Sequence, residues 1–149
     1  MYEYQCKIVR VVDGDTVDVD IDLGFGTWMK KQRIRLYGID TPESRTRDLE
    51  EKKYGIMAKE IVKKYIPEGS TQILRTKKDK AGKYGRILGE FVVAELATGR
   101  TAPNGVTLNK WMIENHYGVT YTGQSKDDIA EQHLRNRELV FNVNPDIVT

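Results

Sequence analysis

The chain has 149 residues, of which 39% are hydrophobic and 31% are charged, so it can build the core of one domain. A single cysteine and two histidines exclude a disulfide framework and a cysteine-rich zinc site, and they argue against a histidine metal cage or a serine-type triad. Carboxylates remain as the main chemical groups, and 22 of them against 24 Lys and Arg give a net charge of +2, which identifies no partner.

The first 40 residues show the alternation of apolar and polar side chains that predicts β-strands. Residues 4–12 form the first expected strand, and Asp13-Gly14 supplies a hairpin turn after it. The second strand, over residues 16–23, has apolar side chains at its odd positions and aspartates on the opposite face. A third strand is expected over residues 33–39.

The rest of the chain predicts two more strands and up to three helices. Apolar side chains at helical spacing indicate a helix over residues 54–65, which Pro67 and Gly69 end. Strands are expected over residues 71–76 and 87–94, and helices over about 108–115 and 126–139. Five strands with two or three helices in one compact unit predict a small β-barrel packed by helices, for which the OB-fold is the natural candidate.

Asp15 is the most informative carboxylate, because it shares the parity of the apolar positions in its strand. Its side chain is therefore expected to turn toward the barrel at the end of the strand. A carboxylate in that place needs a partner, since the burial of an unpaired charge is costly. The alternative is that Asp13 and Asp15 only serve the turn through hydrogen bonds to the backbone.

A second group of polar residues surrounds the end of the third strand, from Arg35 to Glu43. The carboxylates of Asp15 and Asp40, with the backbone carbonyl of Thr41, would give an all-oxygen set of ligands, which Ca²⁺ accepts. Glu43 would then be free to act as a general base on a water beside the cation. Arg35 could bind a phosphate through two parallel hydrogen bonds. The alternative is an ordinary strand-end turn with an Arg–Asp ion pair.

Acidic and basic residues are concentrated in different segments of the chain. Residues 1–30 hold three Lys and Arg against six Asp and Glu, whereas residues 71–90 hold six against two. The division is compatible with a cation site beside a polyanion site. In the basic segment, Lys83 and Arg86 suit a phosphate backbone, and Tyr84 offers an aromatic face for a base or a sugar. The alternative is a solvated hairpin tip, which charged loops usually are.

These motifs, taken in order, resemble the staphylococcal nuclease (thermonuclease) family. The matching segments are Val12-Asp13-Gly14-Asp15-Thr16-Val17, Arg35 through Asp40-Thr41-Pro42-Glu43, and Lys83-Tyr84-Gly85-Arg86, with Lys53-Tyr54-Gly55 and Glu131-Gln132-His133-Leu134-Arg135 as further matches. The likeness covers about residues 6–137, within a single domain over residues 1–149 whose tail, 141–149, stays unassigned. It implies a five-stranded OB-type barrel with about three helices.

The resemblance also implies an activity, that of a Ca²⁺-dependent nuclease which cleaves phosphodiester bonds in DNA and RNA. Asp15, Asp40 and the carbonyl of Thr41 would bind calcium, and Glu43 would orient or deprotonate the attacking water. The other residues carried over are Arg35 and Arg86 on the scissile phosphate, Lys83 and Tyr84 on a neighbouring phosphate, Asp13 behind the metal ligands, and Tyr121 on a nucleotide. The alternative is a noncatalytic nucleic-acid-binding module, against which the complete set of acids and arginines argues.

Two segments depart from the family pattern. Residues 22–30 make a longer connection than the resemblance implies. Phe25, Trp28 and Met29 in it either dock a substrate base or a partner or, as we favour, belong to a hairpin that folds onto the barrel. Residues 97–106 look like an insertion.

The remaining expectations concern location and partners. No signal pattern opens the sequence, and no apolar run approaches the roughly 20 residues of a membrane span. We therefore expect an intracellular or phage-encoded protein rather than a secreted one, with a mature form that has lost its leader as the alternative. We expect a monomer that acts on DNA or RNA, with no membrane and no obligate protein partner. His116 and His133 are expected to be structural.

Overall fold

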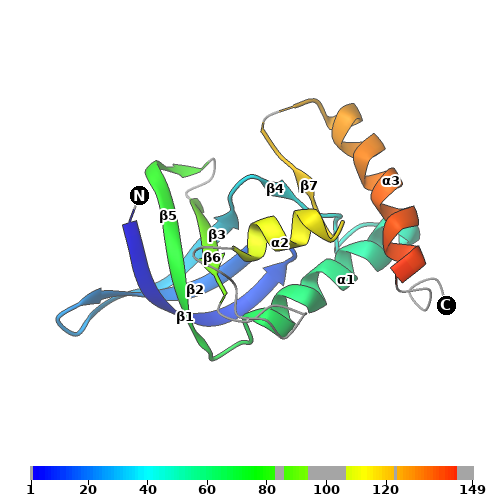
Figure 1. The fold of residues 1–149 in the computed structure, drawn as a ribbon. Helices are drawn as coiled ribbons and strands as arrows, with labels where there is room; N and C mark the ends of the chain where they lie inside the picture. Colours follow the sequence, from blue (N-terminus) through cyan, green and yellow to red (C-terminus); the bar gives the residue numbers. More distant parts are fainter. Residues whose placement is uncertain (1, 83–85, 94–106, 123, 144–149) are drawn as a thin grey trace.

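The computed structural model describes residues 2–82, 86–93, 107–122 and 124–143 (Figure 1). Five strands form a closed barrel in the order β1-β2-β3-β6-β5. Their bounds are β1 Tyr2–Asp13, β2 Thr16–Gly24, β3 Thr27–Leu36, β5 Thr71–Gly82 and β6 Arg86–Val92. Neighbouring strands are antiparallel except β3 and β6, which are parallel. The predicted five-stranded barrel is confirmed.

Three helices and one small sheet complete the described fold. They are α1 (Leu49–Tyr65), α2 (Leu108–Glu114), α3 (Lys126–Val143), and the two-stranded sheet of β4 (Ile39–Asp40) and β7 (Val119–Thr120). The predicted helices are confirmed, whereas strands of two residues are too short to show alternation in a sequence. Within the described ranges, no helix combines the length and the apolarity needed to cross a membrane.

The alternation in β2 explains how this strand divides the core from the solvent. Its odd positions up to Ile21 are buried inside the barrel. The aspartates at even positions lie on the outer face, where Asp18 pairs with Arg33 at 2.9 Å and Asp20 pairs with Lys30 at 3.4 Å. The predicted division of this strand into an apolar and an acidic face is therefore correct.

Helix α1 begins earlier than the apolar pattern predicts, because a polar cap sets its start. The Asp48 side chain accepts hydrogen bonds from the N–H groups of Glu50 and Glu51. Further along, the helix rests directly on the turn between β1 and β2. A Cβ added at Gly14 in that turn would lie 2.7 Å from Cβ of Ala58, so only glycine allows the approach.

The expectation that the connection between β2 and β3 folds onto the barrel is wrong. The two strands stay paired as far as Gly24 and Thr27, and the hairpin projects away from the barrel (Figure 1). Phe25 at its tip is fully exposed, and Trp28 and Met29 are exposed as well. Strand pairing continues to the tip, so the hairpin extends beyond the barrel. These side chains therefore do not pack on the barrel surface.

Two phenylalanines at opposite extremes of burial test this description. Phe91 is completely buried in the core, whereas Phe25 is fully exposed. We expect Phe91→Ala to lower the free energy of unfolding by about 3–5 kcal/mol. The matched change Phe25→Ala should alter it by less than about 0.5 kcal/mol. Urea unfolding followed by circular dichroism measures both, and a large loss in the Phe25 variant would show that the hairpin tip packs against the protein.

Candidate active site

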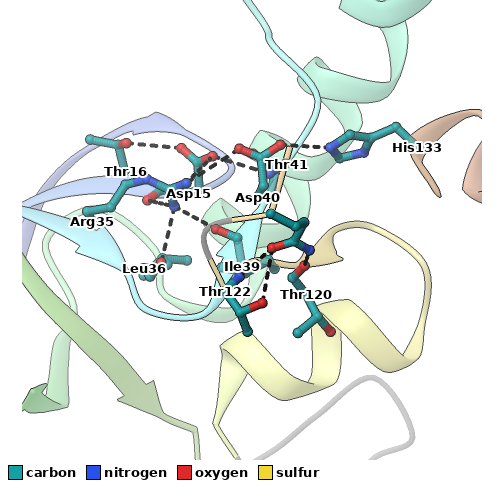
Figure 2. Close-up of polar contacts among 11 residues, drawn as sticks. Asp15, Thr16, Arg35, Leu36, Ile39, Asp40, Thr41, Thr120, Thr122 and His133 are labelled. Atoms are coloured by element: carbon teal, nitrogen blue, oxygen red, sulfur yellow. Dashed lines mark hydrogen bonds and ion pairs between the residues drawn. The ribbon is translucent and has the colours of Figure 1, made fainter. Parts of the chain in front are cut away.

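One cleft brings together five of the ten site residues expected from the sequence. It has a volume of about 900 Å³ and lies where the ends of β3 and β4 meet α3. The polar residues that line it include Arg35, Asp40, Thr41, Glu43, Tyr121 and His133. Figure 2 shows Arg35, Asp15 and Asp40 gathered on one side of this site, with His133 approaching Asp40 from α3. The site therefore combines segments that are far apart in the sequence.

The Arg35 side chain is held by the carbonyl groups of the turn that follows its own strand. Its Nη1 donates hydrogen bonds to the backbone oxygens of Ile39 at 2.8 Å and Leu36 at 3.1 Å. Its Nη2 lies 3.5 Å from both Asp15 Oδ2 and Asp40 Oδ1. Only 15% of the side chain is exposed, so the guanidinium is fixed in orientation and faces two carboxylates.

Asp15 ties the turn between β1 and β2 to the segment after β4. Its Oδ2 accepts a hydrogen bond from the N–H of Thr41 at 3.2 Å, and its Oδ1 accepts one from the Thr16 hydroxyl at 3.1 Å. The sequence required a partner for this carboxylate, and the structure supplies Arg35 as well as Thr41. Asp15 therefore does more than close its own turn.

Asp13 makes a second link between the same two segments. Its carboxylate accepts a short hydrogen bond from the hydroxyl of Ser44, which is buried. Ser44 follows Glu43 in the chain, and the peptide that joins them lies against α1. A Cβ added at Gly55 would lie only 2.3 Å from the backbone oxygen of Glu43. The position of Glu43 thus depends on Asp13 from one side and on the absence of a side chain at Gly55 from the other.

Glu43 stands at the rim of the cleft in a strongly negative surrounding. Desolvation of the part of its carboxyl that faces the site raises its pKa above the ordinary value for a glutamate. Neighbouring carboxylates that add to the rise belong to Asp15, Asp13, Glu51 and Asp40. Such a concentration of negative charge favours a bound cation, which would relieve the repulsion among these groups.

The oxygen atoms at the site have the chemistry that a hard cation prefers. Asp15 and Asp40 converge on the same Arg35 nitrogen, and Thr41 Oγ1 is buried with no hydrogen-bond partner in the described part of the chain. Calcium takes such oxygen ligands and completes its shell with backbone carbonyls and water. No three Asp, Glu, His or Cys side chains among the described residues surround one point. A cation held by the two aspartates would therefore need backbone oxygen and water as its other ligands.

His133 is a member of the site that sequence reasoning did not place there. From the middle of α3, its Nε2 lies 2.8 Å from Asp40 Oδ2, and its side chain is 11% exposed. Arg35 approaches the other oxygen of the same carboxylate. Helical periodicity indicates which side of α3 is buried, but it carries no information about a partner 93 positions earlier in the chain. The expectation of a structural histidine missed this contact.

The phosphate-binding residues expected from the sequence are described only in part. Tyr121 lines the cleft, and its N–H donates to the backbone oxygen of Gly38 at 2.8 Å. Arg86 begins β6, two positions before Leu88, which pairs with Arg35 across the parallel strands. The side chain of Arg86 lies outside the described part of the structure, as do Lys83, Tyr84 and residues 97–106.

Comparison with known proteins points to one family. The family described as staphylococcal nuclease homologue matches residues 33–139. Thermonucleases of Staphylococcus intermedius and Staphylococcus hyicus are 33% and 30% identical, over 85% and 76% of this chain and 72% and 64% of theirs. An uncharacterized endonuclease of Escherichia coli is 28% identical over 83% of this chain and 65% of its own length.

The matches cover only part of this chain and part of its relatives. The chain spans 45% to 65% of the length of three of the curated relatives that it matches. Asp15 lies outside the range matched by the family, which starts at residue 33. Its place in the site therefore rests on the contacts with Arg35 and Thr41.

The close approach at Gly55 can be tested by adding one methyl group. In an exposed helix position, Gly→Ala stabilises a protein by about 0.5–1 kcal/mol. At Gly55 we expect the opposite sign, a loss of about 1–3 kcal/mol, because the methyl group meets the backbone of Glu43. Urea unfolding gives the sign, and amide chemical shifts of Glu43 and Ser44 report the displacement.

Lys52→Ala, an exposed change in the same helix, serves as the control and should alter the free energy of unfolding by less than about 0.5 kcal/mol. A gain of stability in Gly55→Ala, with unchanged shifts at Glu43, would contradict the contact.

Proposed function

The chain belongs to the staphylococcal nuclease homologue family, and on this basis we propose that it is a Ca²⁺-dependent nuclease that hydrolyses phosphodiester bonds of DNA or RNA. The observation that carries the proposal is the convergence of Arg35 with Asp15 and Asp40 in a cleft that has Glu43 at its rim. A phosphodiester is an anion, so its hydrolysis requires positive charge that is held in place before the reaction. Relatives named thermonuclease and endonuclease support the same class of reaction.

Calcium would be held by the carboxylates of Asp15 and Asp40 and by the backbone carbonyl of Thr41. When bound, it supplies positive charge to a phosphate oxygen and lowers the pKa of a neighbouring water. The excess of carboxylates around Glu43 supports a cation at this place, because the described guanidinium of Arg35 balances only part of their charge.

Arg35 would bind the phosphate through its Nη2. Among the described residues, this nitrogen makes long contacts of 3.5 Å to the two aspartates, whereas Nη1 is committed to backbone carbonyls. Once a cation satisfies the aspartates, the N–H groups of Nη2 become available to the phosphate. The pentacoordinate transition state carries more negative charge than the substrate, so a fixed guanidinium stabilises it more strongly. Arg86, at the start of the neighbouring strand β6, is proposed as a second cation for the same phosphate.

Glu43 would accept the proton of the attacking water. Desolvation raises the pKa of the Glu43 carboxyl and makes it a stronger base than an ordinary glutamate. A bound cation would offset the part of the rise that comes from the neighbouring carboxylates. Asp13 would support this step indirectly, since its bond to Ser44 fixes the peptide that follows Glu43.

Cleavage assays with three metal conditions test the proposal. Wild type and Glu43→Gln are incubated with single-stranded DNA and with RNA in Ca²⁺, in Mg²⁺ and in chelator. We expect cleavage by wild type in Ca²⁺, none in chelator, and a turnover about 10²- to 10⁴-fold lower for Glu43→Gln. The melting temperature of Glu43→Gln should be no lower than that of wild type, because the change removes one charge from a group of carboxylates.

Failure of the wild type to cut in Ca²⁺ would reject the nuclease, and binding without cleavage would indicate a noncatalytic nucleic-acid-binding module. Equal turnover of Glu43→Gln and wild type would reject the assigned base alone.

The contact between His133 and Asp40 predicts a specific effect on calcium dependence. Residues that hydrogen-bond to metal ligands typically change metal affinity by about 10- to 100-fold when removed. We expect His133→Ala to raise the Ca²⁺ concentration for half-maximal rate by about tenfold. We expect His133→Gln, which keeps a donor, to lie between His133→Ala and wild type.

Asn136→Ala is the matched control, because it removes another side-chain bond of α3, to the Gly118 carbonyl at 3.3 Å. It should lower the melting temperature like His133→Ala and leave the Ca²⁺ requirement unchanged. Equal shifts of the Ca²⁺ requirement in both variants would show that His133 only holds the helix in place.

A further inference from the structure

Tyr37 is one of the residues that line the cleft, and the reaction described above does not use its side chain. It lies two positions after Arg35, beyond the buried Leu36, and 43% of it is exposed. Burial of a ring of this size is normally favourable, so an exposed tyrosine among the cleft residues is a candidate contact for a ligand. The same cleft is lined by Arg35 and by carboxylates, so one molecule bound in the cleft could contact Tyr37 and Arg35 together.

The backbone that carries this ring is rigid. The N–H of Tyr37 donates to the Gly89 carbonyl of β6 at 2.8 Å, and the carbonyl of Tyr37 accepts from Asn109 Nδ2 at 2.9 Å. Asn109 is itself buried and also donates to the Gly89 carbonyl. On the other side, Tyr121 bonds to the Gly38 carbonyl. The ring therefore stands on a turn held from β6, α2 and the segment after β7, which is the kind of preorganised support that a binding surface needs.

A positive charge lies over one face of the same ring. Lys77, on β5, places its Nζ 4.7 Å from the centre of the Tyr37 ring. This distance is within the range of a cation–π contact. The pair joins an aromatic surface to an ammonium group, whereas the carboxylates of Asp15, Asp13, Glu51 and Asp40 surround Glu43. A flat group attached to a phosphate fits the first region better than the second.

Provided that the chain is the nuclease proposed above, we propose that Tyr37, with Lys77 over one face of its ring, forms a subsite that stacks the unpaired base of a nucleotide on the other face, next to the phosphate at Arg35. Arg35 and Tyr37 are two positions apart at the end of β3, with Cα atoms about 7 Å apart, and both residues line the cleft. Aromatic side chains stack bases of any sequence, but only when the face of the base is free of a neighbour. The subsite therefore recognises a base that has left its stack.

The test uses a short substrate with one cleavable bond. A single-stranded trinucleotide carries one phosphodiester and one methylphosphonate linkage, and the base on either side of the phosphodiester is present or replaced by an abasic sugar. We expect wild type to cut one of the two abasic substrates about 5- to 100-fold more slowly than the intact one. We expect Tyr37→Leu to cut the intact substrate more slowly by the same factor and that abasic substrate no more slowly than wild type does.

Two further variants separate stacking from other effects of the change. Tyr37→Phe keeps the ring and should retain the rate of wild type. Phe25→Leu removes a fully exposed ring on the projecting hairpin, which lies on the side of the barrel away from α3 and the cleft (Figure 1), and should leave the rate unchanged. Equal rates of Tyr37→Leu and wild type on the intact substrate would overturn the subsite. So would an equal loss on intact and abasic substrates, or a loss in Phe25→Leu as large as that in Tyr37→Leu.

A binding measurement keeps this inference distinct from the proposed reaction. The affinity of Glu43→Gln for the fluorescently labelled trinucleotide is compared with that of Glu43→Gln combined with Tyr37→Leu. If wild type cuts nothing but Tyr37→Leu weakens binding of the intact and not the abasic substrate, the nuclease fails and the subsite stands. If wild type cuts and Tyr37→Leu changes neither cleavage nor binding, the nuclease stands and the subsite fails. Absence of both cleavage and binding would overturn both.

Discussion

A largely buried guanidinium, that of Arg35, needs partners, and this need determines how this end of the barrel is arranged. Arg35 is satisfied by the carbonyls of the turn that follows it and by carboxylates from two other segments. A buried charge without a partner destabilises the folded state, so removal of these carbonyls or carboxylates would lower the stability of the protein. The turn between β1 and β2, the end of β3 and the segment after β4 are thereby held around one cation. Asp15 then links to Thr41, which closes the arrangement on itself.

The barrel could be predicted because alternation reports which face of a strand meets the core. The same parity showed that Asp15 turns inward while Asp18 lies outside. Alternation does not report which segment lies opposite. The strands β4 and β7 are too short to show alternation. The contact of His133 with Asp40 joins two elements, and nothing in either sequence indicates that they lie together. The projecting hairpin was missed for a related reason, since apolar residues predict burial only where a surface is available.

One side of the cleft is formed by residues near the C-terminal end of the described chain. Tyr121 and α3 supply it. Tyr121 follows β7, which pairs with β4, whereas among the α3 side chains that the structure describes Val140 alone is buried. Barrel strands pair along their length, whereas α3 leaves many of its side chains exposed. Segments with few buried contacts open at lower free energy than the core around them. Loss of α3 from its place would remove His133 from Asp40 without unfolding the barrel, so the site is less stable than the fold that carries it.

The hairpin between β2 and β3 has a consequence for how this chain tolerates change. Its tip, from Gly24 to Gly26, has positive φ angles, and nothing in the described structure lies within 4 Å of a Cβ added at either glycine. It also lies on the side of the barrel away from α3 (Figure 1). Lengthening a surface loop costs little, because closure entropy grows slowly with loop length. A peptide or a small domain could therefore be inserted there, with the cleft left in its original geometry.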